Sequence, residues 1–134
     1  MTTCIRNGKV VTGERVFEAD ILIQDGRIAE IGAGLSGEKN IDAMGCLIFP
    51  GFIDGHTHLD MPVSGTVTAD TFKTGTEAAL IGGTTMLIDF ATQDKGSTLA
   101  EALRIWHGRA DGNCACDYGF HMAVTDWNEQ TRRE

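Results

Sequence analysis

The order of apolar runs and helical stretches after Pro50 limits the fold of this 134-residue chain more than any other feature. FIDGHTH, TTMLIDFA and ACDYGFHMAV are mostly apolar runs, as strands are when both of their faces are covered. The segments between them carry apolar residues at helical spacing. This is the order of parallel βα units. We therefore predict buried parallel strands near 52–58, 84–90 and 115–123, helices near 70–81 and 97–110, and a further helix starting near Asp126.

Residues 1–50 show a different pattern, with short apolar runs and turn signals but no helical periodicity. Asn7-Gly8 and Asp25-Gly26 each separate two such runs, and both dipeptides favour the positive φ angles of tight hairpin turns. Residues 32–40 are expected to form a loop, and residues 46–49 a short strand. The sequence thus predicts a small β unit over 1–50 and a βα unit over 51–134.

Composition excludes several classes of function. The formal net charge of -8 argues against nucleic-acid binding, because phosphate requires a cationic surface. No apolar run is long enough to span a bilayer, so no membrane partner is expected. The spacing of the four cysteines fits neither a disulfide framework nor a zinc finger, and a reducing cytoplasm is the simplest compartment for Cys4, Cys46, Cys114 and Cys116.

Two histidines close the first run after Pro50, in the stretch GFIDGHTHLD. Residues two apart on a strand share a face, so Asp54, His56 and His58 are expected to project together. At the C-terminal end of a barrel strand, two neutral imidazoles would form a rigid half of a zinc site. Histidines that are solvated or packed are the alternative. HxH pairs also bind metals in all-β cupin barrels, but the helices that follow argue against that fold.

The segment PGFIDGHTHLDMPVSGTVTADTFKTGTEAALIGGTTMLIDFATQ resembles the cyclic amidohydrolases, and most closely their dihydropyrimidinase and D-hydantoinase branch. HTHLDMP, GTVTADTF and GGTTMLIDFA carry the match, and DYGFHMAVTDW continues it. The earlier stretches CIRNGKVVT and ADILIQDGRIAEIG resemble the opening strands of that family's β-sandwich. The resemblance covers essentially the whole chain.

The resemblance implies an α/β fold, in which β-sandwich strands are followed by the first three βα units of a (β/α)8 metal-dependent hydrolase barrel. It implies hydrolytic ring opening of a small cyclic amide, either a hydantoin or a dihydropyrimidine. The cofactor would be a pair of divalent ions, zinc or alternatively manganese, with His56 and His58 binding one of them. The complete protein is expected to be a homo-oligomer.

The sequence also departs from the family pattern. A barrel has eight strands and typically about 250 residues, whereas we count three barrel strands. The family's other ligands are a carboxylated lysine on the fourth strand, histidines on the fifth and sixth, and an aspartate on the eighth. None of these has a counterpart here, so we expect an inactive N-terminal part with no catalytic residue of its own. An allantoinase or a dihydroorotase, and a non-catalytic scaffold relative, are the alternatives.

Five further residues are weaker candidates. Asp54 could orient an imidazole or fill the barrel floor, and Asp89 could reach the histidines or cap the loop that follows it. His121 could line the wall of the pocket or form a hydrogen bond, and simple packing is the alternative. Met61 and Val63 lie in the loop 60–71, which in hydantoinases helps line the pocket around the substituent of the ring; ordinary loop packing is the alternative.

Overall fold

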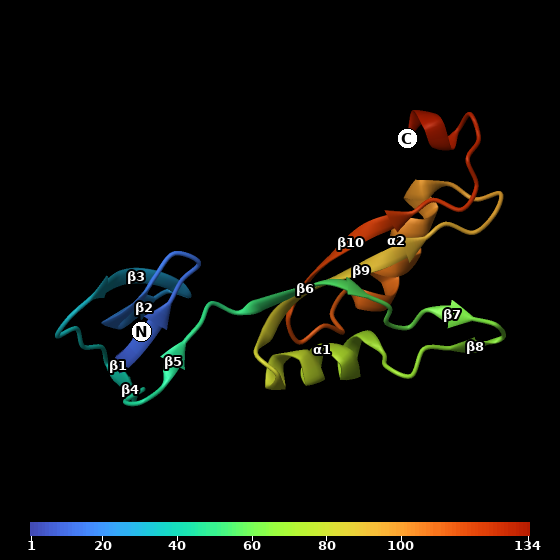
Figure 1. Cartoon of the computed structure of the whole chain (residues 1–134). Coiled ribbons are helices and arrows are strands. Elements are labelled where there is room, and N and C mark those ends of the chain that lie inside the picture. Colours follow the sequence, from blue (N-terminus) through green and yellow to red (C-terminus); the bar gives the residue numbers. More distant parts are fainter. The chain divides into compact units, whose positions relative to one another are not determined.

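The computed structural model describes all residues, 1–134, and the chain forms two compact units, Met1–Pro50 and Gly51–Glu134 (Figure 1). The first unit contains strands and no helix, as predicted. Its single sheet has the order β3-β2-β1-β4, and β5 also pairs with β1. The strands β2 and β3 run antiparallel to their neighbours, whereas β4 and β5 run parallel to β1. Their bounds are β1 Thr2–Val11, β2 Val16–Gln24, β3 Arg27–Gly32, β4 Lys39–Asp42 and β5 Leu47–Ile48.

The two predicted turns of this unit have different outcomes. Asp25 and Gly26 have φ angles of 51° and 73° and join β2 to β3, so this hairpin is confirmed. The hairpin at Asn7-Gly8 is wrong, because β1 continues through both residues. Asn7 does have a positive φ of 63°, but it lies in a β-bulge and donates its main-chain N–H to the Asp20 carboxylate at 3.0 Å. The chain turns instead at residues 12–15, where Thr12 N–H bonds the Arg15 carbonyl.

The second unit contains a parallel three-stranded sheet with the order β10-β9-β6. This confirms the three predicted strands and the two predicted helices (Figure 1). Part of the loop after β6 forms a small antiparallel hairpin that the sequence did not predict. The bounds are β6 Phe52–Thr57, β7 Pro62–Val63, β8 Thr66–Val67, α1 Phe72–Ile81, β9 Thr84–Thr92, α2 Leu99–Ala110 and β10 Asp117–Ala123.

Threonines cap both helices. The Thr71 side chain accepts a hydrogen bond from Thr74 N–H, and the Thr74 side chain accepts one from Thr71 N–H. Thr98 accepts from Glu101 N–H at 3.0 Å, and the Glu101 side chain pairs with Arg104 and so does not form a capping box with Thr98. No helix of the chain is long and apolar enough to cross a membrane.

The core of the second unit lies between the sheet and the two helices. Buried side chains from the strands meet buried side chains from the helices, and they form one cluster of Leu59, Phe72, Leu87, Ala91, Trp106 and Ala110. Burial of such side chains stabilises the unit by about 1.5–3 kcal/mol for each large residue. The cluster covers only one face of the sheet, so the other face is more exposed.

The helix predicted to start near Asp126 is wrong for residues 124–130, which are not helical. A single 3-10 turn follows at Thr131–Arg133. Gln93 fixes the start of residues 124–130, since its side-chain oxygen accepts the N–H groups of Thr125 and Asp126. The Asp126 carboxylate in turn accepts Gly96 N–H, so the main-chain N–H and the side chain of Asp126 are both bound to the segment after β9.

Candidate metal centre

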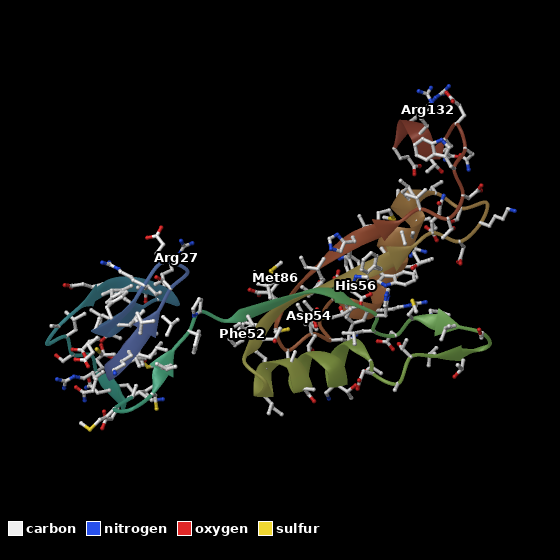
Figure 2. All side chains as sticks on the ribbon, viewed as in Figure 1. Arg27, Phe52, Asp54, His56, Met86 and Arg132 are labelled. Atoms are coloured by element: carbon white, nitrogen blue, oxygen red, sulfur yellow. The ribbon has the colours of Figure 1, made fainter.

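The two histidines of the HxH motif lie together at the C-terminal end of β6, which Figure 2 marks with Asp54 and His56. Their Nε2 atoms are 3.3 Å apart, and the rings meet edge to face with centroids 5.1 Å apart. A tetrahedral zinc ion with Zn–N distances of about 2.0–2.1 Å places two ligand nitrogens about 3.3 Å apart. The spacing of the two nitrogens therefore fits a shared ion.

The strand that carries the pair is not buried. Residues 52–56 are exposed and Thr57 is half-buried, contrary to the buried strand that the sequence predicted. The reason is its position, because β6 lies at one edge of the sheet and pairs only with β9. No group of three or more His, Cys, Asp or Glu side chains that could hold a metal ion occurs in the chain. The pair thus offers two ligands and leaves the remaining positions of an ion open.

One aromatic ring supports the imidazoles from the neighbouring strand. The centroid of Phe90 on β9 lies 4.5 Å from that of His56, 5.2 Å from that of His58 and 4.9 Å from that of His121. Sequence reasoning did not single out Phe90. The alternation of side chains along TTMLIDFA could have indicated it, because buried residues 87, 89 and 91 place residue 90 on the other face.

The strand β6 carries a bulge just before the pair. Asp54 is opposite Leu87 and Thr57 is opposite Asp89, so three steps along β6 match two along β9. Asp54 accepts the main-chain N–H of His56 at 3.1 Å, so its side chain bonds the backbone and not an imidazole. A bulge of this kind leaves backbone groups outside the ladder and re-aims the side chains beside it.

His121 of β10 reaches across the sheet to the same bulge. Its Nε2 lies 3.1 Å from the carbonyl oxygen of Gly55. A carbonyl only accepts hydrogen bonds, so Nε2 is the donor of this bond. Of the two functional interpretations of His121, the hydrogen-bonding one therefore has a specific partner.

Asp89 lies on the helix-covered face of the sheet and does not reach the imidazoles. Its side chain is 1% exposed. One oxygen, Oδ2, accepts the Thr57 hydroxyl at 3.1 Å and Leu59 N–H at 2.7 Å. The other, Oδ1, accepts Phe90 N–H at 2.8 Å and the Trp106 indole N–H at 3.2 Å. The predicted contact with the histidines is wrong because side chains alternate along β9, and Phe90 occupies the histidine side.

The two apolar loop candidates lie in different surroundings. Met61 packs against the buried cluster between the sheet and the helices, and its main chain bonds Thr68 in both directions. Val63 is 43% exposed in the small hairpin. Met61 is half-buried and Val63 is more exposed, so the part of both residues in a substrate pocket stays a proposal.

The sequence of this chain is similar to those of known proteins. Residues 47–111 match the amidohydrolase family. The D-hydantoinase of Geobacillus stearothermophilus is 52% identical over 136 residues, which is 100% of this chain and 29% of that protein. The D-hydantoinase of Streptomyces coelicolor is 50% identical over 98% of this chain and 30% of its own length, and the dihydropyrimidinase of Rattus norvegicus is 44% identical over 97% and 26%.

Solved structures agree with the sequence relatives. A crystal structure of D-hydantoinase matches with a TM-score of 0.96 at 48% identity, over 100% of this chain and 30% of the other. The dihydropyrimidinase of Brevibacillus agri matches with a TM-score of 0.95 at 47% identity, over 99% and 29%. The chain thus spans about 30% of the length of these relatives. With a β-rich first unit followed by parallel strands and helices, the chain is similar to the amidohydrolase family over residues 47–111, and to D-hydantoinases and dihydropyrimidinases over nearly its whole length.

Proposed function

We propose that this chain contributes the first metal-binding strand of a hydrolase that opens small cyclic amides, of the hydantoin or dihydropyrimidine type. The observation that carries the proposal is the 3.3 Å separation of the two Nε2 atoms at the end of β6. Support for the substrate class comes from the relatives, which are named D-hydantoinase and dihydropyrimidinase. Those names also favour this reaction over the allantoinase and dihydroorotase alternatives.

The metal is the finer part of this proposal. Amidohydrolases are generally metal-dependent, and we propose zinc as the ion held by His56 and His58, with manganese as the second choice. Two neutral imidazoles suit zinc, and the spacing of their nitrogens fits its tetrahedral geometry. A divalent ion at this position supplies a Lewis acid that polarises a carbonyl and lowers the pKa of water. Retention of both ligands argues against a non-catalytic scaffold.

The roles of the chain's own residues follow from the geometry. His56 and His58 hold their Nε2 atoms 3.3 Å apart, and the ring of Phe90 packs against both imidazoles. His121 anchors the Gly55 carbonyl beside them. With two ligands the site is incomplete, since zinc sites use three or four protein ligands. The 134-residue chain by itself is therefore expected to show no turnover of hydantoin or dihydrouracil.

A chimaera tests the function directly. The matching segment of the Geobacillus stearothermophilus D-hydantoinase, 52% identical, would be replaced by this chain and the product assayed for hydantoin ring opening with added zinc or manganese. We expect an active chimaera, loss of activity in His56→Ala and His58→Ala, and retained activity in His107→Ala, whose imidazole bonds Asp111 at 2.9 Å at the end of α2. A folded, metal-loaded chimaera without activity would contradict the proposal.

Two further expectations from the sequence stay predictions. The complete protein is proposed to be a homo-oligomer, which sedimentation of the active chimaera would test. A reducing cytoplasm is proposed as its location, in keeping with four cysteines that are all free thiols in the structure.

A further inference from the structure

We propose that Asp89 is a positioning residue for the His56–His58 pair, and that it acts through the main chain of β6 without touching either ring. The proposal rests on the proposed function, because it concerns the same two metal ligands. It differs from the role that second-shell carboxylates commonly have, which is to accept a hydrogen bond from the imidazole itself.

The contacts of one carboxylate oxygen carry the proposal. Asp89 Oδ2 accepts the hydroxyl of Thr57, the residue between the two histidines, at 3.1 Å. The same oxygen accepts the N–H of Leu59, the residue directly after His58, at 2.7 Å. The residues on both sides of His58 are therefore tied to a single atom, Thr57 through its side chain and Leu59 through its main chain, and this limits how far the two imidazoles can separate.

The segment needs such a hold because little else fixes it. The bulge between Asp54 and Thr57 interrupts the ladder with β9, and the opposite edge of β6 has no partner strand. The hydrogen bonds of the sheet alone therefore do not fix the position of His56 and His58. The contact from Asp89 replaces the missing ladder bonds at the point where the ligands leave the strand.

Asp89 is rigid enough for this role. It is 1% exposed, and its second oxygen is bound by the indole N–H of Trp106, a residue of α2 that is itself 4% exposed. Hydrogen bonds to a carboxylate are roughly twice as strong as those between neutral groups. Asp89 is therefore hydrogen-bonded both to Trp106 of α2 and to the residues on either side of His58.

The test is zinc binding to the 134-residue chain, read at the histidines themselves. Zinc would be titrated while the ring ¹⁵N signals of His56 and His58 are followed by NMR, in a Cys46→Ser background that removes the exposed thiol. Thr57→Val deletes only the hydroxyl that reaches Oδ2, and Asp89→Asn replaces one acceptor oxygen by a donor. Loss of outer-shell partners typically weakens metal affinity about 10–100-fold, and we expect a weakening of this order in both variants.

Thr76→Val is the matched control. It is the same substitution at a fully buried threonine of α1, whose hydroxyl accepts Ala115 N–H and donates within its own helix to the carbonyls of Phe72 and Lys73. We expect its zinc affinity to be unchanged although it loses stability. Equal zinc affinities in Thr57→Val and Thr76→Val would overturn the positioning role, even if Asp89→Asn fails to fold. If His58→Ala still binds zinc as the wild type does, the metal pair of the proposed function fails, and the positioning role fails with it.

Discussion

The two faces of the β6–β9–β10 sheet are built from alternate residues of the same strands, yet they have opposite properties. On one face Leu87, Asp89 and Ala91 are buried against α1 and α2. On the other, Phe90 is half-buried and the histidines around it are exposed. The covered face holds a fully bonded carboxylate, and the open face holds imidazoles with free nitrogens. Buried residues that hold the strand in place thus alternate along β9 with residues that face the histidines.

The difference explains how an exposed edge strand keeps two ligands in register. Packing on the helix side fixes Asp89, and Asp89 fixes the backbone whose side chains project from the opposite side. Substitutions on the covered face should therefore change the free energy of unfolding, and substitutions on the open face should change the histidine geometry. The following predictions test that division.

The largest expected effect compares two neighbours on β9. Leu87→Ala removes a side chain that is 4% exposed in the cluster and should lower the free energy of unfolding by about 2–5 kcal/mol. Ile88→Ala, on the open face, should cost clearly less because that side chain is only half-buried. Urea unfolding of the 134-residue chain measures both. Equal losses would show that the two faces do not differ as described.

A second prediction concerns the link between α2 and Asp89. Trp106→Phe keeps most of the buried ring but removes the indole donor, which should cost about 1–3 kcal/mol. Asp89→Ala and Trp106→Phe should not be additive in a double-mutant cycle, because both remove the bond between the indole N–H and the carboxylate. Additive losses in urea unfolding would mean that the indole and the carboxylate are not coupled.

A third prediction concerns the open face. His121→Ala removes the bond to the Gly55 carbonyl and should cost no more than about 1.5 kcal/mol, since the side chain is exposed. The ring signals of His56 should nevertheless shift in NMR spectra, because Gly55 precedes it in the bulge. A large loss of stability with unchanged His56 signals would contradict the description of this face as one that affects histidine geometry more than stability.

The smallest effect is a pH dependence on the covered side of β10. The Tyr118 hydroxyl donates to the Asp111 carboxylate, and this bond raises the pKa of Tyr118 to about 12, from an ordinary value of 10.0. The neutral phenol is thus favoured in the folded chain. Its contribution should be complete below pH 10.0 and lost as the pH rises to about 12.

Tyr118→Phe provides the comparison, because it lacks this titration. The wild type should lose stability relative to the variant between those two pH values, as shown by urea midpoints. Tyr118 is the only tyrosine of the chain, so tyrosinate absorbance reports its ionisation directly. A tyrosinate that forms at the ordinary value would remove the basis of the prediction.

Much of the second unit could be predicted because its signals are local. The apolar runs and helical spacing predicted the three strands of the parallel sheet and both α-helices, and a spacing of two predicted that His56 and His58 lie together. Asn7-Gly8 was misassigned because the same dipeptide suits a hairpin turn and a bulge. The partner that selects the bulge, Asp20, lies thirteen residues away.

The supporting contacts of the site could not be predicted for the same reason. The bulge in β6 depends on its register with β9, and the bond between Leu59 and Asp89 spans thirty residues. The residue type and the strand of Asp89 were visible in the sequence, but the face it occupies was not. The helices that cover the sheet decide which face Asp89 occupies. On the covered face Asp89 contacts the chain beside the histidines, and not the imidazoles themselves.

The central claim is that His56 and His58 converge on one ion and form part of a larger metal site. Zinc titration of the 134-residue chain, followed by isothermal calorimetry and by the ring ¹⁵N signals, tests it most directly. We expect one weakly held ion that shifts both rings together and is lost in His58→Ala, since two ligands fall short of the three or four of a stable zinc site. A tight, stoichiometric zinc site that survives His58→Ala would contradict the account.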